Sequence, residues 1–554
     1  MPILPFAGGT ALATGASSLP DLYEASVLEL QHGLYSGLFT SVDLVKAYIA
    51  RIEEVNLHGP ALRAVIEVNP SALKQAAELD RERKRYGKRT LLHGIPVLLK
   101  DNIGTIASEG MNTTAGSFSL LRSVVPDDAG VVKKLRKAGA IILGKTNMSE
   151  FSHARSDTLP SGWSGRGGQN TNAYFPSADP CGSSSGSGVA VLIGLAAVTL
   201  GSDTGGSITC PSSRNNAVGI KPTVGLTSRA GGRPSFVPFE HFILLNSILV
   251  IPISTNQDSI GPMTRSVSDA AIVLSLIAGK DPKDNFTLAQ PGILPDYVEA
   301  LDVEAFKGKR IGVPRKGFLD EGSIEPPIAT AFEEALETIR GLGATIVDPA
   351  DLPSAQDILN STSEASESLL LLIDFKVQLN AYYEALLENP SGARSLDDLI
   401  AFNNANPDLE EPVNFTDQST LIAAQATNGF NESYFTALWN NHDLGRTRGI
   451  DAAMREHKLD ALMLPASFLS VTPAAIAGYP VVTVPLGFLP DDTAIGTTGL
   501  LTVYPAPGVP FGLSFFGGAY SEFDLVGFGF AYEQKTKTRL KRRALPEAIP
   551  KTQL

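Results

Sequence analysis

Apolar and polar positions in the first part of the chain switch between helical and extended spacing. After Thr40, with Asp43 three residues later as in a capping box, apolar residues recur at positions 44, 45, 48, 49 and 52, which form one helical face. Short apolar runs at 95–99, 141–143 and 197–200 instead predict buried strands, and 131–138 and 187–195 predict helices. Helices that alternate with buried strands are typical of an α/β sheet with helices on its faces.

The pattern changes in the second half of the chain. Residues 320–445 predict long helices with polar faces, among them 328–342 and 364–387, before apolar runs return at 460–466, 480–488 and 511–518. A sheet interrupted by a helical insertion explains this better than two independent domains. We therefore predict one domain over 20–540, with an α/β core at 60–315 and 450–535 and a helical insertion at about 320–445.

Composition and charge make nucleic acid and a membrane poor candidates for the partner of this chain. The chain has 554 residues, of which 43% are hydrophobic, and a formal net charge of −13, which makes nucleic acid a poor partner. Its longest apolar runs, 189–200 and 242–253, are shorter than the roughly 20 residues that a membrane span needs. The first 20 residues do not resemble a signal peptide, which favours a cytoplasmic localisation. The alternative is secretion, which a missing N-terminal segment and the N-x-S/T sequons would suit.

Metal and cofactor chemistry is not expected. Cys181 and Cys210 are the only cysteines, and the seven histidines include no H-x-x-x-H or H-E-x-x-H pair. The two cysteines lie two residues before Ser183 and three residues after Ser207. They are either two buried free thiols, the simpler interpretation, or a disulfide.

Candidate chemistry is concentrated in three segments. In "LHGIPVLLKDNIGT" (92–105), Lys100 ends an apolar strand, where burial would lower its pKa and make it a base near neutral pH. In "LGSDTGGSITCPSS" (200–213), Gly205 and Gly206 allow a sharp turn whose N–H groups can converge on an oxyanion. Between them, "DPCGSSSGSGVAV" (179–191) is rich in serine.

The serine-rich segment also matches a different catalytic motif. Gly182, Ser184 and Gly186 form the G-x-S-x-G of an α/β-hydrolase nucleophile elbow, with His442 or His457 as a downstream base. An elbow follows a strand, whereas "FPSADP" precedes this one. An esterase that uses Ser184 is therefore the weaker interpretation.

Taken together, the segments resemble the amidase signature family of serine hydrolases, which use a Ser–cis-Ser–Lys triad. Four segments of this chain correspond to patterns of the family. They are 94–101 (G-I-P-x-x-x-K-D), 182–187 (G-G-S-S-G-G-S), 201–208 (G-T-D-x-G-G-S-I-R-x-P) and 219–225 (G-L-K-P-T-x-G). Ser183 and Ser207 are 24 residues apart, as in the family. The resemblance covers roughly 20–535 and implies an amidase-signature fold, a central mixed twisted sheet covered by helices on both faces.

The resemblance implies a role for each matching residue. Ser207 would be the nucleophile, Ser183 the bridging serine that follows a cis peptide bond, and Lys100 the base. The implied activity is hydrolysis of a linear carboxamide, a small-molecule amide or peptide amide, to a carboxylic acid plus ammonia or an amine through an acyl-enzyme on Ser207. The remaining residues that it implies are the oxyanion-hole N–H groups of Thr204, Gly205, Gly206 and Ser207, and the supporting residues Ser185, Asp203 and Asn147.

The chain also departs from the family pattern. Thr209 replaces the usual Arg, so the ion pair that this Arg makes with the position of Asp203 is missing. Three segments are most similar in sequence to bacterial peptide amidases and their fungal relatives: 162–169, 180–188 and 205–211. This similarity suggests a substrate whose leaving group is a small amine. The segment 232–250 fits no pattern of the family. It is either a loop over the site or the product of an in-frame retained intron or a gene-model error.

One alternative shares the triad. The amidase subunit of a tRNA-dependent amidotransferase carries the same catalytic residues, so the motifs alone do not separate it from a free-standing amidase. The similarity to peptide amidases and the atypical segment 232–250 favour the free-standing amidase. The sequence leaves the oligomeric state open.

Overall fold

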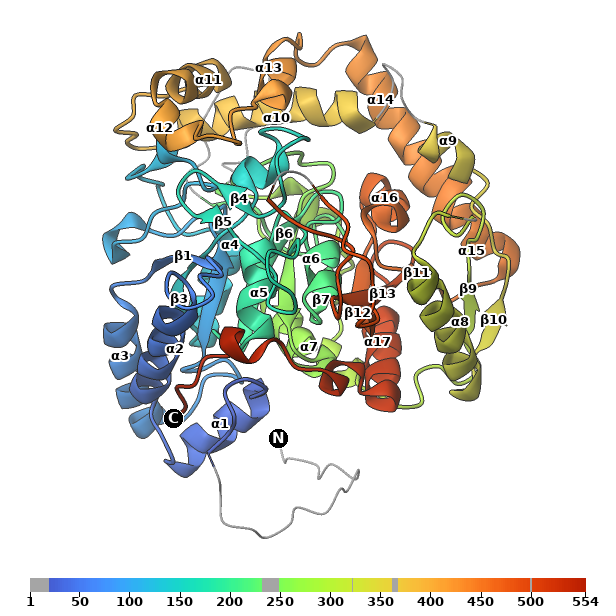
Figure 1. Cartoon of the computed structure of the whole chain (residues 1–554), viewed down its shortest axis with the longest axis horizontal. Helices are drawn as coiled ribbons and strands as arrows, with labels where there is room; N and C mark the ends of the chain where they lie inside the picture. The colour runs from blue at the N-terminus through green and yellow to red at the C-terminus, as the bar shows by residue number, and fades with distance from the viewer. Residues whose placement is uncertain (1–18, 232–248, 321, 361–366, 499–500) are drawn as a thin grey trace.

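The protein is built on one large sheet, seen in Figure 1. The computed structural model describes residues 19–231, 249–320, 322–360, 367–498 and 501–554, so nearly all of the atypical segment 232–250 lies outside the described residues. The sheet has 11 strands in the order β1-β3-β2-β6-β8-β7-β12-β13-β11-β9-β10. Their bounds are β1 (Val65–Val68), β2 (Pro96–Lys100), β3 (Ile141–Thr146), β6 (Val198–Asp203), β7 (Val218–Lys221), β8 (Ser259–Thr264), β9 (Arg310–Gly312), β10 (Thr345–Val347), β11 (Ala461–Pro465), β12 (Val481–Phe488) and β13 (Pro510–Phe516).

Three parallel strands position the candidate chemistry. β2 pairs in parallel with β3 and with β6, and Lys100 lies opposite Thr146 while Leu99 lies opposite Leu200. Parallel strands that are covered on both faces are buried and apolar, which explains the continuous hydrophobic runs. Their carboxyl ends meet at one edge of the sheet, so Lys100 and Asp203 arrive there together.

Helices cover both faces of the sheet, as the resemblance implied. On one face, α4 (Gly130–Ala138), α7 (Val267–Ile277) and α17 (Glu522–Thr536) pack against one another and the strands, and on the other α5 (Ser185–Leu192) contacts α6 (Thr209–Arg214). The N-terminal helices α1 (Val27–Ser36), α2 (Ser41–Val55) and α3 (Ala72–Tyr86) lie at the β1 end of the sheet, beside the C-terminus (Figure 1). The capping box predicted at the start of α2 is confirmed.

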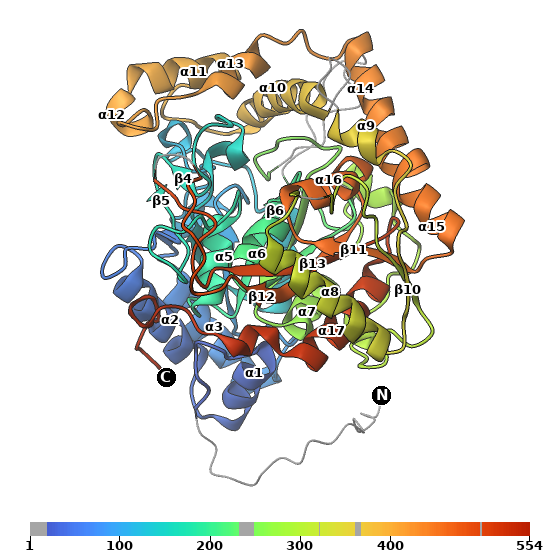
Figure 2. The same ribbon diagram turned by 45° about the vertical axis from the view of Figure 1, so that its right-hand side comes forward.

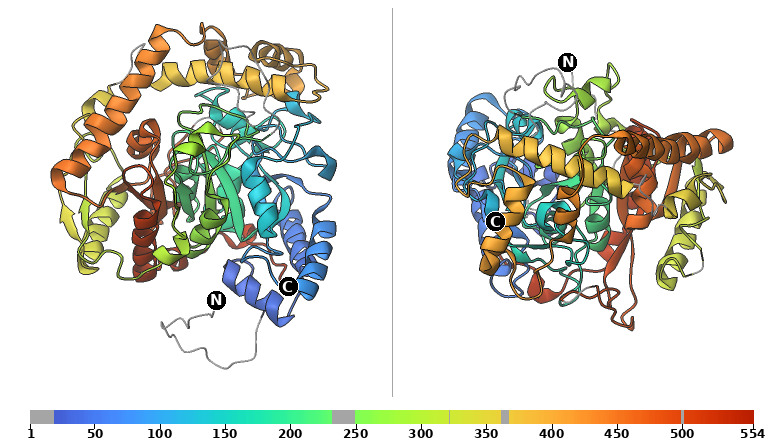
Figure 3. Two further views of the ribbon diagram at one scale, coloured as in Figure 1. Left: turned by 180° about the vertical axis from the view of Figure 1, so that it is seen from behind. Right: turned by 90° about the horizontal axis from the view of Figure 1, so that it is seen from above.

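The yellow and orange helices form an arch over one end of the core in Figures 1 and 2, and Figure 3 shows the same arch from behind and above. A π-helical turn (Asp443–Ile450) joins its last two helices. The arch consists of α9 (Ala355–Leu359), α10 (Glu367–Ala385), α11 (Leu396–Ala405), α12 (Pro407–Glu410), α13 (Ser419–Gln425), α14 (Glu432–His442) and α15 (Asp451–His457).

The predicted insertion at 320–445 is not helical throughout. It contains the edge strand β10, which pairs in parallel with β9, and α8 (Pro326–Gly341), which packs on β11 and β12. With three residues each, β9 and β10 are too short to show a period, so the helical pattern of α8 dominated the prediction for this part of the chain. Within the described residues, no helix combines the length and apolar character that crossing a bilayer requires.

Candidate active site

Lys100 lies fully buried at the end of β2. Its Nζ donates to Ser183 Oγ at 2.5 Å, to Ser202 Oγ at 3.0 Å and to the carbonyl oxygen of Ser202 at 3.2 Å. Burial lowers the pKa of Lys100 to about 7, although the carboxylates of Asp203 and Asp258 favour the charged form. Near neutral pH a large fraction of this lysine is therefore an amine that can accept a proton from Ser183.

Ser202 is a neighbour that sequence reasoning missed. Its hydroxyl accepts from Lys100 and also from Asn102 Nδ2, at 2.9 Å, so Ser202 helps to hold the lysine in place beside Ser183. The available signal was its place in the G-S-D stretch that ends β6. Strand alternation gives Ser202 and Asp203 opposite directions, and only the packed sheet shows which of them reaches the lysine.

The serine-rich segment forms a turn and the start of α5. The peptide bond between Gly182 and Ser183 is cis, as the resemblance implied. Ser184 is fully buried and donates to the carbonyl oxygen of Ser202 at 3.0 Å, so it has no access to a substrate. This burial argues against the α/β-hydrolase interpretation, in which Ser184 would be the nucleophile.

Two residues placed in supporting roles lie around this turn. Ser185 Oγ is buried with no hydrogen-bond partner among the described residues. Asn147 accepts the N–H of Gly186 on its backbone oxygen at 3.1 Å, and its side-chain amide donates to the carbonyl oxygens of Arg63 and Gly168, both at 3.0 Å. Asn147 thus ties the first turn of α5 to two other segments without lining the cavity.

Ser207 lies in the turn between β6 and α6, with 9% of its surface exposed. The carboxylate of Asp203 holds this turn by accepting the N–H groups of Gly206 (2.8 Å), Ile208 (2.6 Å) and Thr209 (3.3 Å). Three backbone donors thus surround the carboxylate of Asp203, where Thr209 stands in place of the arginine of the family pattern. The Thr209 hydroxyl donates to the carbonyl oxygen of Gly206, at 3.2 Å.

The same contacts correct one part of the predicted oxyanion hole. The N–H of Gly206 is already donated to Asp203 Oδ1, whereas the N–H groups of Thr204, Gly205 and Ser207 donate to no other group within the described part of the chain. Gly206 has another role. Its φ is +110°, and a Cβ there would lie 2.6 Å from the ring of Phe468, so only glycine fits this turn.

Ser183 and Ser207 line the same cavity, but the described residues show no hydrogen bond between their hydroxyls. The two segments are joined through the backbone instead, where the N–H of Ser184 donates to the carbonyl oxygen of Ser207 at 3.1 Å. Catalytic hydrogen bonds are often long before substrate binds, so a relay between these two hydroxyls is compatible with this geometry.

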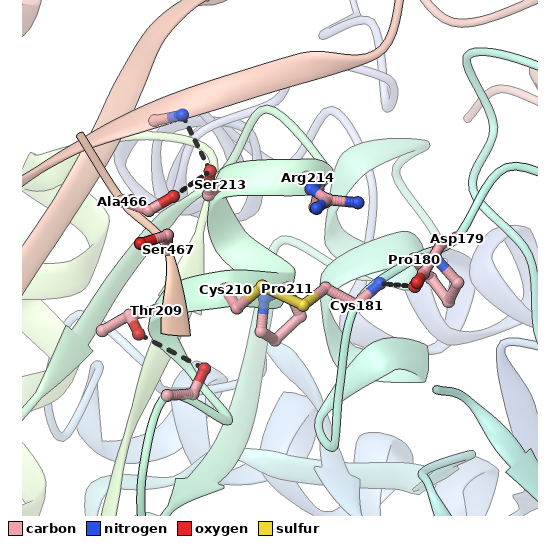
Figure 4. Close-up of a disulfide and its surroundings, with 12 residues drawn as sticks. Asp179, Pro180, Cys181, Thr209, Cys210, Pro211, Ser213, Arg214, Ala466 and Ser467 are labelled. Carbon is pink, nitrogen blue, oxygen red and sulfur yellow. Dashed lines mark hydrogen bonds between the residues drawn. A yellow bond between two sulfur atoms is a disulfide. The ribbon is translucent and has the colours of Figure 1, made fainter. Parts of the chain in front are cut away.

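A disulfide between Cys181 and Cys210 joins the same two segments (Figure 4). The free-thiol interpretation is therefore wrong. Cys181 lies in the turn before Ser183, where its N–H donates to Asp179 Oδ1 at 2.6 Å, and Cys210 lies in α6 just after Ser207. The covalent bond thus links the loop of the bridging serine to the helix that follows the candidate nucleophile.

The cavity in front of the serines has a volume of about 630 Å³ and lies between the core and the helical arch. Gly182, Ser183, Thr204, Gly205 and Ser207 form its floor. Its apolar wall includes Ile253, Phe468 and three residues of α10, Leu371, Leu372 and Phe375. No cluster of three or more potential metal ligands occurs among the residues described here.

Comparison with known proteins agrees with this geometry. A family model described as Amidase matches residues 43–526. The native peptide amidase of Stenotrophomonas maltophilia, a solved structure, is 42% identical, with a TM-score of 0.80 over 96% of this chain and 99% of that one.

Two curated relatives extend over most of the chain. A protein of Arthroderma benhamiae whose name gives amidase as an inferred activity is 40% identical, over 96% of this chain and 89% of the relative. The A subunit of the glutamyl-tRNA(Gln) amidotransferase from Geobacter metallireducens is 31% identical, over 93% of this chain and 98% of the relative.

Proposed function

The chain belongs to the Amidase family and is an amide hydrolase, and on this premise we propose that Ser207 is its nucleophile, Ser183 its proton relay and Lys100 its base. The observation that carries this assignment is the hydrogen bond from the buried Lys100 to Ser183 at the floor of the cavity that Ser207 also lines. A buried lysine with a pKa of about 7 and a serine partner has the properties of a general base.

The first half-reaction forms an acyl-enzyme. Neutral Lys100 accepts the proton of Ser183 while Ser183 accepts that of Ser207, and Ser207 Oγ bonds to the amide carbonyl carbon. The N–H groups of Thr204, Gly205 and Ser207 stabilise the resulting oxyanion, and each such donor is worth on the order of 10²–10³ in rate. The relay then returns a proton to the leaving nitrogen, the C–N bond breaks, and ammonia or an amine departs.

The second half-reaction releases the acid by the same route. Water takes the place of the leaving amine, gives its proton through Ser183 to Lys100, and attacks the acyl carbon. The ester bond to Ser207 breaks, and the proton returns to Ser207 Oγ. The carboxylic acid leaves, and the lysine is neutral again for the next turnover.

For the substrate, we propose a linear carboxamide whose leaving group is small. Similarity to a peptide amidase at 42% identity over nearly the whole chain supports this choice. The apolar wall formed by α10 would take an aliphatic or aromatic acyl side chain, because burial of such a group is favourable by roughly 25 cal/mol per Å².

The amidotransferase component remains the second candidate because of the 31% identical relative. Its ammonia donor, glutamine, carries an α-carboxylate that needs a cation. The cavity presents Asp157 and Glu367 but neither lysine nor arginine among the described residues that line it. This charge pattern favours a free-standing amidase.

Alanine variants test the proposal. With a panel of aliphatic, aromatic and peptide amides, we expect ammonia release by the wild-type enzyme and a loss of at least about 10³-fold in kcat for Ser207→Ala. Ser184→Ala is the matched control and should retain activity. An inactive Ser184→Ala beside an active Ser207→Ala would overturn the assignment, and glutaminase activity that requires tRNA would favour the amidotransferase.

A further inference from the structure

Glu367, the first residue of α10, lies next to the turn that carries Ser207 although 160 residues separate them. Gln257, which is 1% exposed, connects the two: its Nε2 donates to Glu367 Oε1 at 2.7 Å and to the carbonyl oxygen of Thr204 at 3.2 Å. A Cβ placed on Gly205 would lie 3.8 Å from Glu367 Oε1. The carboxylate therefore borders the proposed oxyanion hole.

The charge of the cavity around this carboxylate is one-sided. Its ionisable lining residues in the described ranges are Asp157, Glu367 and His153, and burial lowers the pKa of His153, which keeps the imidazole neutral. No described cation lies close enough to Glu367 to offset the burial that raises the pKa of its carboxyl group. A positively charged ligand beside Glu367 would lower that pKa again and favour the carboxylate, so a cation is the partner that this site lacks.

We propose that Glu367 is a specificity-determining residue, which selects amides that carry an ammonium group on the carbon next to the scissile carbonyl. The proposal rests on the proposed function, because it places the substrate carbonyl oxygen at the N–H groups of the Ser207 turn. With the carbonyl oxygen there, the proposal directs the adjacent carbon toward Glu367, whose carboxylate borders the same turn. Its ammonium would donate to the carboxylate, and its side chain would lie on Leu371, Leu372 and Phe375.

Two amides of the same shape test this selection. Phenylalaninamide carries the ammonium, which is still largely protonated at pH 7, and 3-phenylpropanamide lacks it. We expect wild-type kcat/KM to be at least about tenfold higher for phenylalaninamide, the effect of one charge-assisted hydrogen bond. Glu367→Gln should remove this preference, chiefly through KM, and change kcat/KM for 3-phenylpropanamide by less than about twofold.

Glu384→Gln is the matched control, because it removes the same charge from an exposed position of the same helix. It should leave both substrates unaffected. An equal loss on both amides in Glu367→Gln would overturn the proposal, since Glu367 would then only brace the Ser207 turn through Gln257. An unchanged preference would overturn it as well.

A binding measurement separates this proposal from the proposed function. In Ser207→Ala, calorimetry should show tighter binding of phenylalaninamide than of 3-phenylpropanamide, and Ser207→Ala/Glu367→Gln should bind the two equally. This result would stand even if the wild-type enzyme cleaved neither amide, which would instead refute the proposed function for this substrate class. Equal binding of the two amides to Ser207→Ala would refute the role of Glu367.

Discussion

The disulfide between Cys181 and Cys210 allows a quantitative prediction of stability. The two cysteines are 29 residues apart, and closing a loop of that length removes about 12 cal/mol/K of entropy from the unfolded chain, or roughly 3.6 kcal/mol at 25 °C. For a cooperative unfolding of all 554 residues, with about 2.1 cal/mol/K per residue, this corresponds to a Tm lower by about 3 °C in Cys181→Ser/Cys210→Ser.

The same variant should also lose activity. The bond joins the segments of Ser183 and Ser207, whose hydroxyls must approach during the reaction, so we expect kcat to fall about tenfold with little change in KM. The assays are thermal unfolding by fluorescence of the two tryptophans and ammonia release under saturating amide.

Reduction provides the control for this prediction. Dithiothreitol should lower the Tm and kcat of the wild-type protein toward the values of the double variant and leave the double variant unchanged. A double variant with wild-type kcat and a Tm within about 1 °C of wild type would refute the reasoning, because packing alone would then hold the two segments together.

Three further predictions concern the charged groups around the site. Burial lowers the pKa of Lys100 to about 7, and the neutral amine is the active form. For 3-phenylpropanamide, which carries no ammonium of its own, kcat/KM should therefore be lost as pH falls through about 7 and reach a plateau above it, and a value that falls between pH 7 and 9 would contradict the assignment. In Asp203→Asn, the amide side chain has a single acceptor oxygen and cannot accept all three N–H groups of the Ser207 turn. We expect kcat to fall about 10²-fold or more while circular dichroism shows an intact fold. A near-normal kcat would show that the turn keeps its conformation without these hydrogen bonds. Arg155 Nη1 lies 2.6 Å from a carboxylate oxygen of Glu150 and 3.5 Å from one of Glu410, and all three side chains are buried. Arg155→Met should destabilise the protein by about 3–5 kcal/mol in urea titrations where the acids are charged. Because burial raises the pKa of both carboxyl groups, that of Glu410 to about 8, the loss should shrink as pH falls and the acids become protonated.

Local pattern was enough to predict the frame of the molecule. The apolar runs that became β2, β3 and β6, and the periodic segments that became α2, α4 and α5, appear in the structure within a few residues of their predicted bounds. Burial of a strand or of one helical face is set by side chains close in sequence, so periodicity reveals it. The short strands β9 and β10 at one end of the sheet were not predicted, because three residues are too few to show a period.

What the sequence by itself determined is the type of chemistry, because Lys100, Ser183 and Ser207 stand in short motifs whose spacing is specific to one family. Tertiary structure decided which other groups reach them. The disulfide, the contact of Ser202 with Lys100, and the position of Glu367 beside the Ser207 turn all depend on how distant segments pack. The hydrophobic period of a segment carries no information about contacts with distant segments. Each of these residues would fit its own local pattern equally well in a different arrangement of the sheet.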